Sequence, residues 1–215
     1  SSPSRGLGDV YKRQAYAADN TAAIAATNTL LATCAAGLAW LIVEKIRDKK
    51  ATSLGAASGI VAGLVAITPA CANVTPMGAI LLGLVAGAVC AWAVTLKYKL
   101  GFDDSFDVVG IHLVGGLVGT LALGFLASDL VEEGGQNGLL YGGDLNLLIV
   151  QIIAAAGVMV YSLILAGIIA LALKATIGIR SDEEDEVNGI DVAEHAETAY
   201  ELSLIHISEP TRRTT

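Results

Sequence analysis

Residues 101–127 read GFDDSFDVVGIHLVGGLVGTLALGFLA, in which three aspartates precede a long apolar run with a single histidine, His112. An apolar run of about 20 residues is long enough to cross the ~30 Å hydrocarbon core of a membrane. A titratable side chain inside such a run is costly, and intramembrane ionisable residues mark functional sites. His112 is therefore the first candidate functional residue, and the rest of the chain is interpreted around it.

The composition indicates an integral membrane protein. Of the 215 residues, 54% are hydrophobic and only 16% are charged, whereas a soluble domain carries about 25% charged residues. The net charge of −8 comes mostly from residues 182–201 and one loop, and no cluster of Lys and Arg suggests a nucleic-acid partner. Cys34, Cys71 and Cys90 are odd in number and lie in or beside apolar runs. They predict packing residues rather than a zinc site or a disulfide framework.

The apolar runs predict an all-α polytopic bundle with five transmembrane spans. We expect the spans at about residues 21–43, 52–72, 76–96, 105–127 and 145–175. Asp19, Asn20 and Thr21 are candidate caps of the first span, and Pro76 suits the first helical position of the third. The fifth span would be ~45 Å long at 1.5 Å per residue, so it must tilt or protrude.

The basic residues predict the orientation of the chain in the membrane. Those between residues 15 and 200 follow the first, third or fifth span: Lys45, Arg47, Lys49, Lys50, Lys97, Lys99, Lys174 and Arg180. Because basic loops stay in the cytoplasm, these loops and the C-terminal segment are expected on the cytoplasmic side of the plasma membrane. Residues 178–201 then form an acidic cytoplasmic tail, either a solvated segment or one that docks or gates.

The two ends of the chain fit neither the membrane pattern nor the acidic tail. Residues 1–14 and 202–215 resemble translated sequencing-adapter or vector sequence, and they are left out of the fold prediction. The remainder is expected to be a fragment, with a transmembrane bundle at 15–177 and the tail at 178–201.

His112 allows two interpretations. If the fourth helix begins near Ser105, the imidazole lies about seven residues, or ~10 Å, inside the membrane. A packing histidine would hydrogen-bond between helices, which contributes about 1 kcal/mol. A pore-lining imidazole would donate from one nitrogen and accept at the other, which suits passage of a small polar molecule or proton relay. The glycines of this span are typical of close helix packing and also leave room for a narrow lumen; they are Gly110, Gly115, Gly116 and Gly119.

Residues 103–119, DDSFDVVGIHLVGGLVG, resemble the signature of the ammonium transporter (Amt/Rh) family, D-D-x-x-D-V-x-G-x-H-x-x-G-G-x-x-G. Further blocks agree in collinear order over about residues 15–201. These blocks are AASG at 56–59 with GLV at 63–65, TPAC at 68–71, and GIR at 178–180 with GID at 189–191 and His195.

The resemblance implies an eleven-span fold whose first ten helices form two inverted repeats, with a pore in each subunit of a homotrimer. The five spans would be helices seven to eleven. His112 matches the second of twin pore histidines, and Ser58 matches a serine near the cytoplasmic half of the pore. Asp103, Asp104 and Asp107 would lie at the cytoplasmic mouth as helix caps. The first histidine and the outer ammonium site belong to the other half, so this chain is not expected to transport alone.

The resemblance implies transport of ammonium or ammonia across a lipid bilayer, without enzymatic activity, cofactor or metal. Ammonium would lose its proton near the outer mouth, and the neutral species would pass the histidines. A sensor of the same fold and a structural bundle without a pore are the alternatives. Five tail residues resemble the family's regulatory C-terminus, which in prokaryotes meets PII-type signal proteins on the cytoplasmic side: Gly178, Arg180, Gly189, Asp191 and His195.

Overall fold

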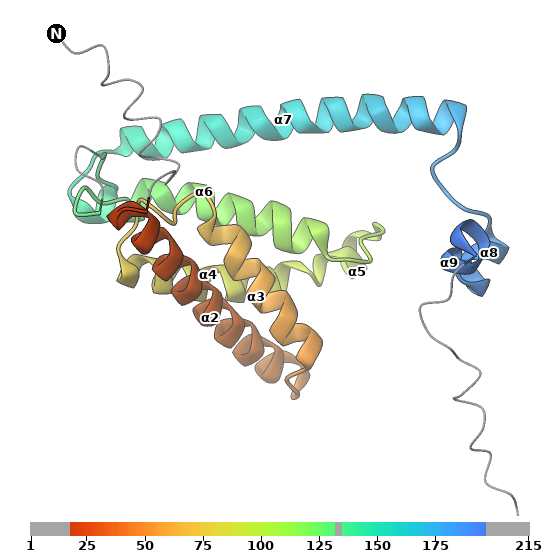
Figure 1. Cartoon of the computed structure of the whole chain (residues 1–215), viewed down its shortest axis with the longest axis horizontal. Helices are drawn as coiled ribbons and strands as arrows, with labels where there is room; N and C mark the ends of the chain where they lie inside the picture. Colours follow the sequence, from red (N-terminus) through yellow and green to blue (C-terminus); the bar gives the residue numbers. More distant parts are fainter. Residues whose placement is uncertain (1–17, 132–134, 197–215) are drawn as a thin grey trace, which may run out of the picture. The chain divides into compact units, whose positions relative to one another are not determined.

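The structure is a computed structural model that describes residues 18–131 and 135–196 (Figure 1). Helices account for the regular secondary structure of these residues, apart from an isolated bridge between Val74 and Ala127. The prediction of an all-α fold is therefore confirmed. The chain divides into two units, with the boundary between Val158 and Met159, and each unit is described by itself.

The first unit is built around three helices in mutual contact: α2 (Asn20–Asp48), α3 (Ser53–Ile67) and α4 (Pro76–Ala93) (Figure 1). Small residues allow their backbones to approach closely, as in many membrane helix pairs. A Cβ added at Gly83 or Gly87 of α4 would collide with the backbone of α2. The glycines at spacing four therefore fix the distance between these helices.

Local capping explains where the helices begin. The Asp19 carboxylate accepts a hydrogen bond from the Ala22 N–H (3.0 Å), which makes Asp19 the N-cap of α2. Thr52 and Thr75 cap α3 and α4 in the same way through their hydroxyl groups. Pro76 occupies the first turn of α4, where its missing N–H costs nothing.

The second predicted span is shorter than the sequence suggested. We expected it at 52–72, but α3 has 15 residues and ends at Ile67, about 22 Å at 1.5 Å per residue. Pro69 lacks an N–H, and the chain continues in turns in which Ala70 N–H donates to Ile67 C=O (2.9 Å). Among the described residues, four helices are long and apolar enough to cross a membrane: Asn20–Asp48, Pro76–Leu100, Val109–Leu126 and Leu145–Thr176.

The fourth predicted span also begins later than expected. After α5 (Leu96–Leu100), helical structure resumes in a π-helix, η1 (Val109–Leu113), which continues directly into α6 (Val114–Leu126). The helix starts at Val109 rather than Ser105 because the preceding residues form a loop, in which the Asp104 carboxylate accepts hydrogen bonds from the Val108 and Val109 N–H groups. Helix α6 packs against α3 and α4.

Further along the first unit, a short 3₁₀ helix, η2 (Leu139–Tyr141), precedes α7 (Leu145–Thr176). The Tyr141 hydroxyl lies 2.9 Å from the Thr75 hydroxyl and ties this loop to the start of α4. Helix α7 has no buried residue in the described structure and continues into the second unit. The second unit also contains α8 (Glu183–Asn188) and α9 (Ile190–His195), which contact each other.

Candidate functional site

His112 lies in η1, the π-helix that opens the third of the membrane-length helices. In this segment Val114 N–H donates to Val109 C=O, five residues back. Single π-turns within α-helices are rare and occur frequently at functional sites. His112 is exposed, whereas the two preceding residues, Gly110 and Ile111, are buried. Because η1 begins at Val109, His112 is in the first helical turn and not about seven residues into the helix.

The loop before η1 is organised by Asp104. Its carboxylate accepts hydrogen bonds from Val108 N–H (2.8 Å) and Val109 N–H (3.0 Å), which caps the first turn. Asp103 accepts a hydrogen bond from the Ser105 hydroxyl (3.1 Å). Asp104 therefore fixes the start of the helix that carries His112, and Asp103 holds the loop before it.

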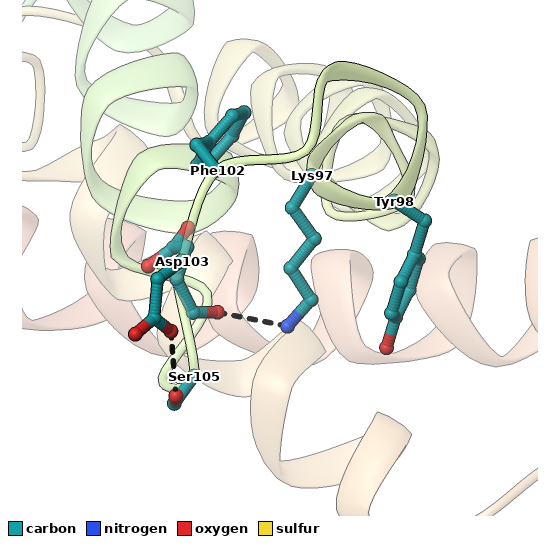
Figure 2. Close-up of a pocket in the computed structure, with 6 residues that line it drawn as sticks. Lys97, Tyr98, Phe102, Asp103 and Ser105 are labelled. Atoms are coloured by element: carbon teal, nitrogen blue, oxygen red, sulfur yellow. Dashed lines mark hydrogen bonds between the residues drawn. The ribbon is translucent and has the colours of Figure 1, made fainter.

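A lysine on α5 holds the same loop. The Lys97 ammonium donates to the Asp104 carbonyl oxygen (2.8 Å) and lies 2.7 Å from Asp107 Oδ1. Figure 2 shows the Lys97 side chain reaching from its helix to the loop that bears Asp103 and Ser105. These residues line a shallow pocket of about 230 Å³ together with Tyr98 and Phe102. In Figure 2 the Phe102 and Tyr98 rings lie on different sides of the Lys97 side chain.

The glycines of this span divide into packed and open positions. A Cβ on Gly110 would collide with Val94 after α4, and one on Gly119 would collide with the carbonyl of Ala66 on α3. Gly115 faces α3 and α4 at ordinary contact distance. Gly116 has open space where a Cβ would be, with no atom within 4 Å. Gly116 follows His112 by four residues, so the two share one face of the helix.

Ser58 lies on α3 and is half-buried. Gly55, Gly59 and Gly63 hold this helix close to α2, since a Cβ at each would meet an α2 atom at under 3 Å. Helix α3 also contacts η1, the segment that carries His112. The structure therefore brings the two helices of the predicted pore residues together.

Two buried polar residues on α2 were not identified from the sequence as site residues. Asn28 is completely buried, and its Nδ2 donates to the carbonyls of Cys71 (2.8 Å) and Val74 (2.7 Å). Glu44 is buried, and its carboxylate accepts from the Thr52 N–H (2.9 Å) and hydroxyl (2.8 Å). The sequence feature that could have identified Asn28 is its amide side chain within the first apolar run. Glu44 was hidden because it adjoins the basic segment EKIRDKK.

The predicted tail residues belong to the second unit. Gly178 has a φ of +82° and follows the end of α7, where its N–H donates to Leu173 C=O (3.0 Å). Gly189, with φ of +109°, joins α8 to α9. Such φ values favour glycine. Asp191 lies in the first turn of α9 and His195 ends this helix, and both are exposed.

Arg180 connects the segment after α7 to α8. Its guanidinium donates to both carboxylate oxygens of Glu186, at 2.7 and 3.0 Å. The hydrogen bonds from Arg180 hold the pKa of the Glu186 carboxyl below its ordinary value. This ion pair holds the segment after α7 against α8.

The site offers an imidazole beside open space and three aspartates in the preceding loop, of which Asp104 caps the helix, Asp103 binds the Ser105 hydroxyl and Asp107 pairs with Lys97. No group of three or more His, Cys, Asp or Glu side chains with the arrangement of a metal site occurs among residues 18–131 and 135–196. A neutral imidazole both donates and accepts a hydrogen bond. The arrangement therefore suits contact with a small polar molecule or a proton.

Long apolar helices with close glycine packing define the class of helical, polytopic membrane proteins, and His112 is the histidine of the membrane-length helices in the described residues. Residues 13–200 match the sequence profile of the Ammonium Transporter Family. The chain belongs to this family.

Ammonium transporters of other organisms and solved structures of such proteins are also similar to this chain. The chain is 54% identical over 195 residues to an ammonium transporter of Mycobacterium tuberculosis, a match that covers 88% of this chain and 41% of the relative. It is 43% identical to an ammonium transporter of Bacillus subtilis, with coverage of 86% and 46%. The crystal structure of Candida albicans Mep2 matches with a TM-score of 0.70 and 32% identity, covering 77% of this chain and 38% of Mep2. The chain thus spans less than half the length of these relatives.

Proposed function

We propose that the protein of which this chain forms part transports ammonium or ammonia across a membrane. Family membership supports the substrate class, since the relatives at up to 54% identity are ammonium transporters. The observation that carries the proposal is the exposed His112 imidazole next to the open position at Gly116 on the same helix face. This face would line one side of the path, with Ser58 on the neighbouring α3.

The proposed chemistry follows from the groups on this face. Among the described residues of η1 and α6 there is no carboxylate, so a permeating cation would meet no fixed negative charge that retains it. Ammonia would cross between apolar walls and hydrogen-bond to His112 in passing. The imidazole would act as an acceptor for its N–H groups, with proton relay as a second role.

We further propose that this chain supplies one half of the pore, namely helices seven to eleven of the family fold. The coverage of 41% and 46% of two relatives supports a share of about half, and the order of the sequence blocks that resemble the family supports the choice of these helices. The other half would supply the partner histidine and the outer ammonium site. The 215-residue chain alone, reconstituted in liposomes, should give no ammonium flux above that of protein-free liposomes.

The test is ammonium uptake by a chimaera in which residues 13–200 replace the matching region of the M. tuberculosis transporter. His112→Ala should lower uptake at least tenfold or change the selectivity between ammonium and methylammonium. Phe106→Ala is a matched control, because Phe106 is 88% exposed in the loop before η1. Unchanged flux and selectivity in the His112 variant would remove His112 from the mechanism.

A second candidate function is ammonium sensing through the cytoplasmic tail. It is favoured by a solved structure titled Sensor Amt Protein, which matches with a TM-score of 0.71 and 28% identity and covers 81% of this chain. A sensor would bind ammonium and signal without carrying flux. Flux through the reconstituted chimaera, measured with and without the tail, separates the two functions.

We also propose an orientation of the chain in the membrane and two kinds of protein partner. The basic residues in the last turns of α2 and α7, in α5 and in the segments that follow them support a cytoplasmic location for these loops and for the tail. We propose a homotrimer that meets a PII-type signal protein through residues 178–201. Co-purification of a PII protein with the chimaera should be lost when these residues are deleted, and retained binding would contradict it. Native mass spectrometry of the chimaera tests the trimer.

A further inference from the structure

Thr120 lies on α6, two turns beyond His112, and is used neither by the glycine packing nor by the path proposed above. Gly116 and Thr120 are four residues apart, so they share one face of the helix. Each directly follows a glycine that faces α3: Gly115 precedes Gly116, and Gly119 precedes Thr120. Since successive residues of an α-helix are about 100° apart, Gly116 and Thr120 turn away from α3 in the same direction. Thr120 is therefore on the open face that carries His112.

The Thr120 hydroxyl differs from those of the other threonines in the membrane-length helices. Beyond the first turn of these helices, each of the other described threonines donates its hydroxyl hydrogen to a carbonyl three or four residues earlier: Thr27, Thr29, Thr33, Thr95 and Thr176. Within residues 18–131 and 135–196, the hydroxyl of the half-buried Thr120 has no hydrogen-bond partner. A threonine hydroxyl in a membrane helix normally binds its own or a neighbouring helix. The Thr120 hydroxyl is thus free to bind a molecule that moves along this face.

Thr120 and His112 lie at two different levels of the α3–α6 pair. The glycines of α6 meet the carbonyls of Ala62 and Ala66 in chain order, so α3 and α6 run side by side in the same direction. His112 is then level with the turn of α3 that carries Ser58, and Thr120 is level with the end of α3. The eight residues between His112 and Thr120 correspond to ~12 Å at 1.5 Å per residue. The open face therefore carries polar groups at two separate depths.

We propose that Thr120 is a second polar contact of the ammonium path, a residue whose hydroxyl hydrogen-bonds the permeating molecule. The inference rests on the proposed function, because it assigns a further residue to the same path. A threonine hydroxyl has one O–H donor and two acceptor lone pairs. It can donate to the lone pair of ammonia and accept from an N–H of ammonia, ammonium or methylammonium. Because the hydroxyl carries no charge, it contacts both protonation states without retaining the cation.

Ammonium uptake by the chimaera tests this contact. Thr120→Val removes the hydroxyl and keeps the branched shape, so uptake below saturation should fall about threefold or more, as expected for the loss of one hydrogen bond. Thr120→Ser keeps the hydroxyl and should stay close to the parent. Thr33→Val is the matched control, because Thr33 is also half-buried but donates to the Thr29 carbonyl of its own helix (2.6 Å). It should leave uptake unchanged.

Modification of a cysteine after folding separates a contact on the path from a structural role. The parent is the chimaera with Cys34→Ser and Cys71→Ser, in which the buried Cys90 is kept. Thr120→Cys in this parent is treated with methanethiosulfonate-ethylammonium, which adds a small cationic group to an accessible thiol. The treatment should lower uptake by this variant about fivefold or more and should leave the parent and Thr33→Cys unchanged.

His112→Ala in the same assay distinguishes failure of this inference from failure of the proposed function. Uptake that is unchanged in Thr120→Val but lowered in His112→Ala overturns the role of Thr120 and leaves the proposed path in place. A chimaera without flux, or unchanged uptake in both variants, overturns the proposed path and the role of Thr120 together.

Three further results would overturn the role of Thr120. Equal loss of uptake in Thr120→Val and Thr120→Ser would show that the hydroxyl is not the group that matters. A thermal midpoint of Thr120→Val below that of Thr33→Val would assign the hydroxyl to the stability of the fold. Uptake by Thr120→Cys that the thiosulfonate does not change would place this side chain away from the path.

Discussion

His112 and Gly116 lie one helical turn apart on the same face, with the imidazole exposed and no atom within 4 Å of the missing Cβ of Gly116. On the other side of the same helix, Gly119 is pressed against the backbone of α3. One helix therefore presents an open face with a polar group and a closed face used for packing. Substitutions on the open face and on the packed face should therefore have different effects on transport and on stability.

Substitution of the two glycines by alanine should have different effects on stability. At Gly119 the new methyl group meets the backbone carbonyl of Ala66, which a rotamer change cannot relieve, so Gly119→Ala should cost about 1–3 kcal/mol. Gly116→Ala enters open space and should raise stability by about 0.5–1 kcal/mol, because alanine favours the helix more than glycine does. Thermal unfolding of the chain in detergent measures both, and equal midpoints would show that the packing is different from that described.

Asn28 should be important for stability because its buried amide joins α2 to the turn after α3. Asn28→Leu leaves the carbonyls of Cys71 and Val74 without their buried donor, and an unsatisfied buried group costs about 1–3 kcal/mol. The same substitution at the exposed Asn146 is the control and should be nearly neutral. If the two variants unfold at the same temperature, Asn28 does not join α2 to the turn after α3.

Loss of the Glu44 carboxylate should loosen the first turn of α3. Glu44→Ala removes the acceptor of the Thr52 N–H and hydroxyl, a loss comparable to that of a helix cap, about 0.5–2 kcal/mol. Hydrogen exchange at the N-terminus of α3 should become several-fold faster, whereas Lys45→Ala, at an exposed neighbour, should leave it unchanged. Equal exchange in both variants would contradict the capping role.

The pair between Arg180 and Glu186 predicts a pH dependence of the tail. Because the pKa of Glu186 is lowered by the hydrogen bonds from Arg180, the pair stabilises the tail above the ordinary carboxyl pKa of about 4.3 and is lost as the pH falls through the lowered value. The titration midpoint of the Glu186 carboxyl, followed by NMR, should rise in Arg180→Met. A midpoint that is independent of Arg180 would mean that the pair does not form in solution.

Much of the fold could be predicted because its signals are local. Asp19 and Pro76 act within one turn of their own helices, and both helices begin where these residues indicate. The length of α3 was overestimated because apolar content alone does not show that the turns at Pro69 end the helix. Length and polarity are thus reliable for the class of fold and less so for the ends of its elements.

The site was less predictable because it depends on contacts between distant parts of the chain. The sequence identified His112, but it did not show the π-turn that contains it, the ion pair of Lys97 with Asp107 in the preceding loop, or the contact of Gly119 with Ala66 on α3. Lys97 itself was noted only as a sign of orientation. Spacing within one segment does not show which of four glycines face another helix and which one leaves space.

Ammonium uptake by the chimaera with Gly116→Leu tests whether the substrate passes along the face of His112 and Gly116. The Cβ of the leucine enters open space, with no atom of another helix within 4 Å, and the rest of its side chain would extend from there along the face that carries His112. Uptake should fall to background while abundance and the thermal midpoint stay at the values of the unsubstituted chimaera. Uptake close to that of the unsubstituted chimaera, from a protein equally abundant and stable, would show that ammonium does not pass along the face of His112 and Gly116.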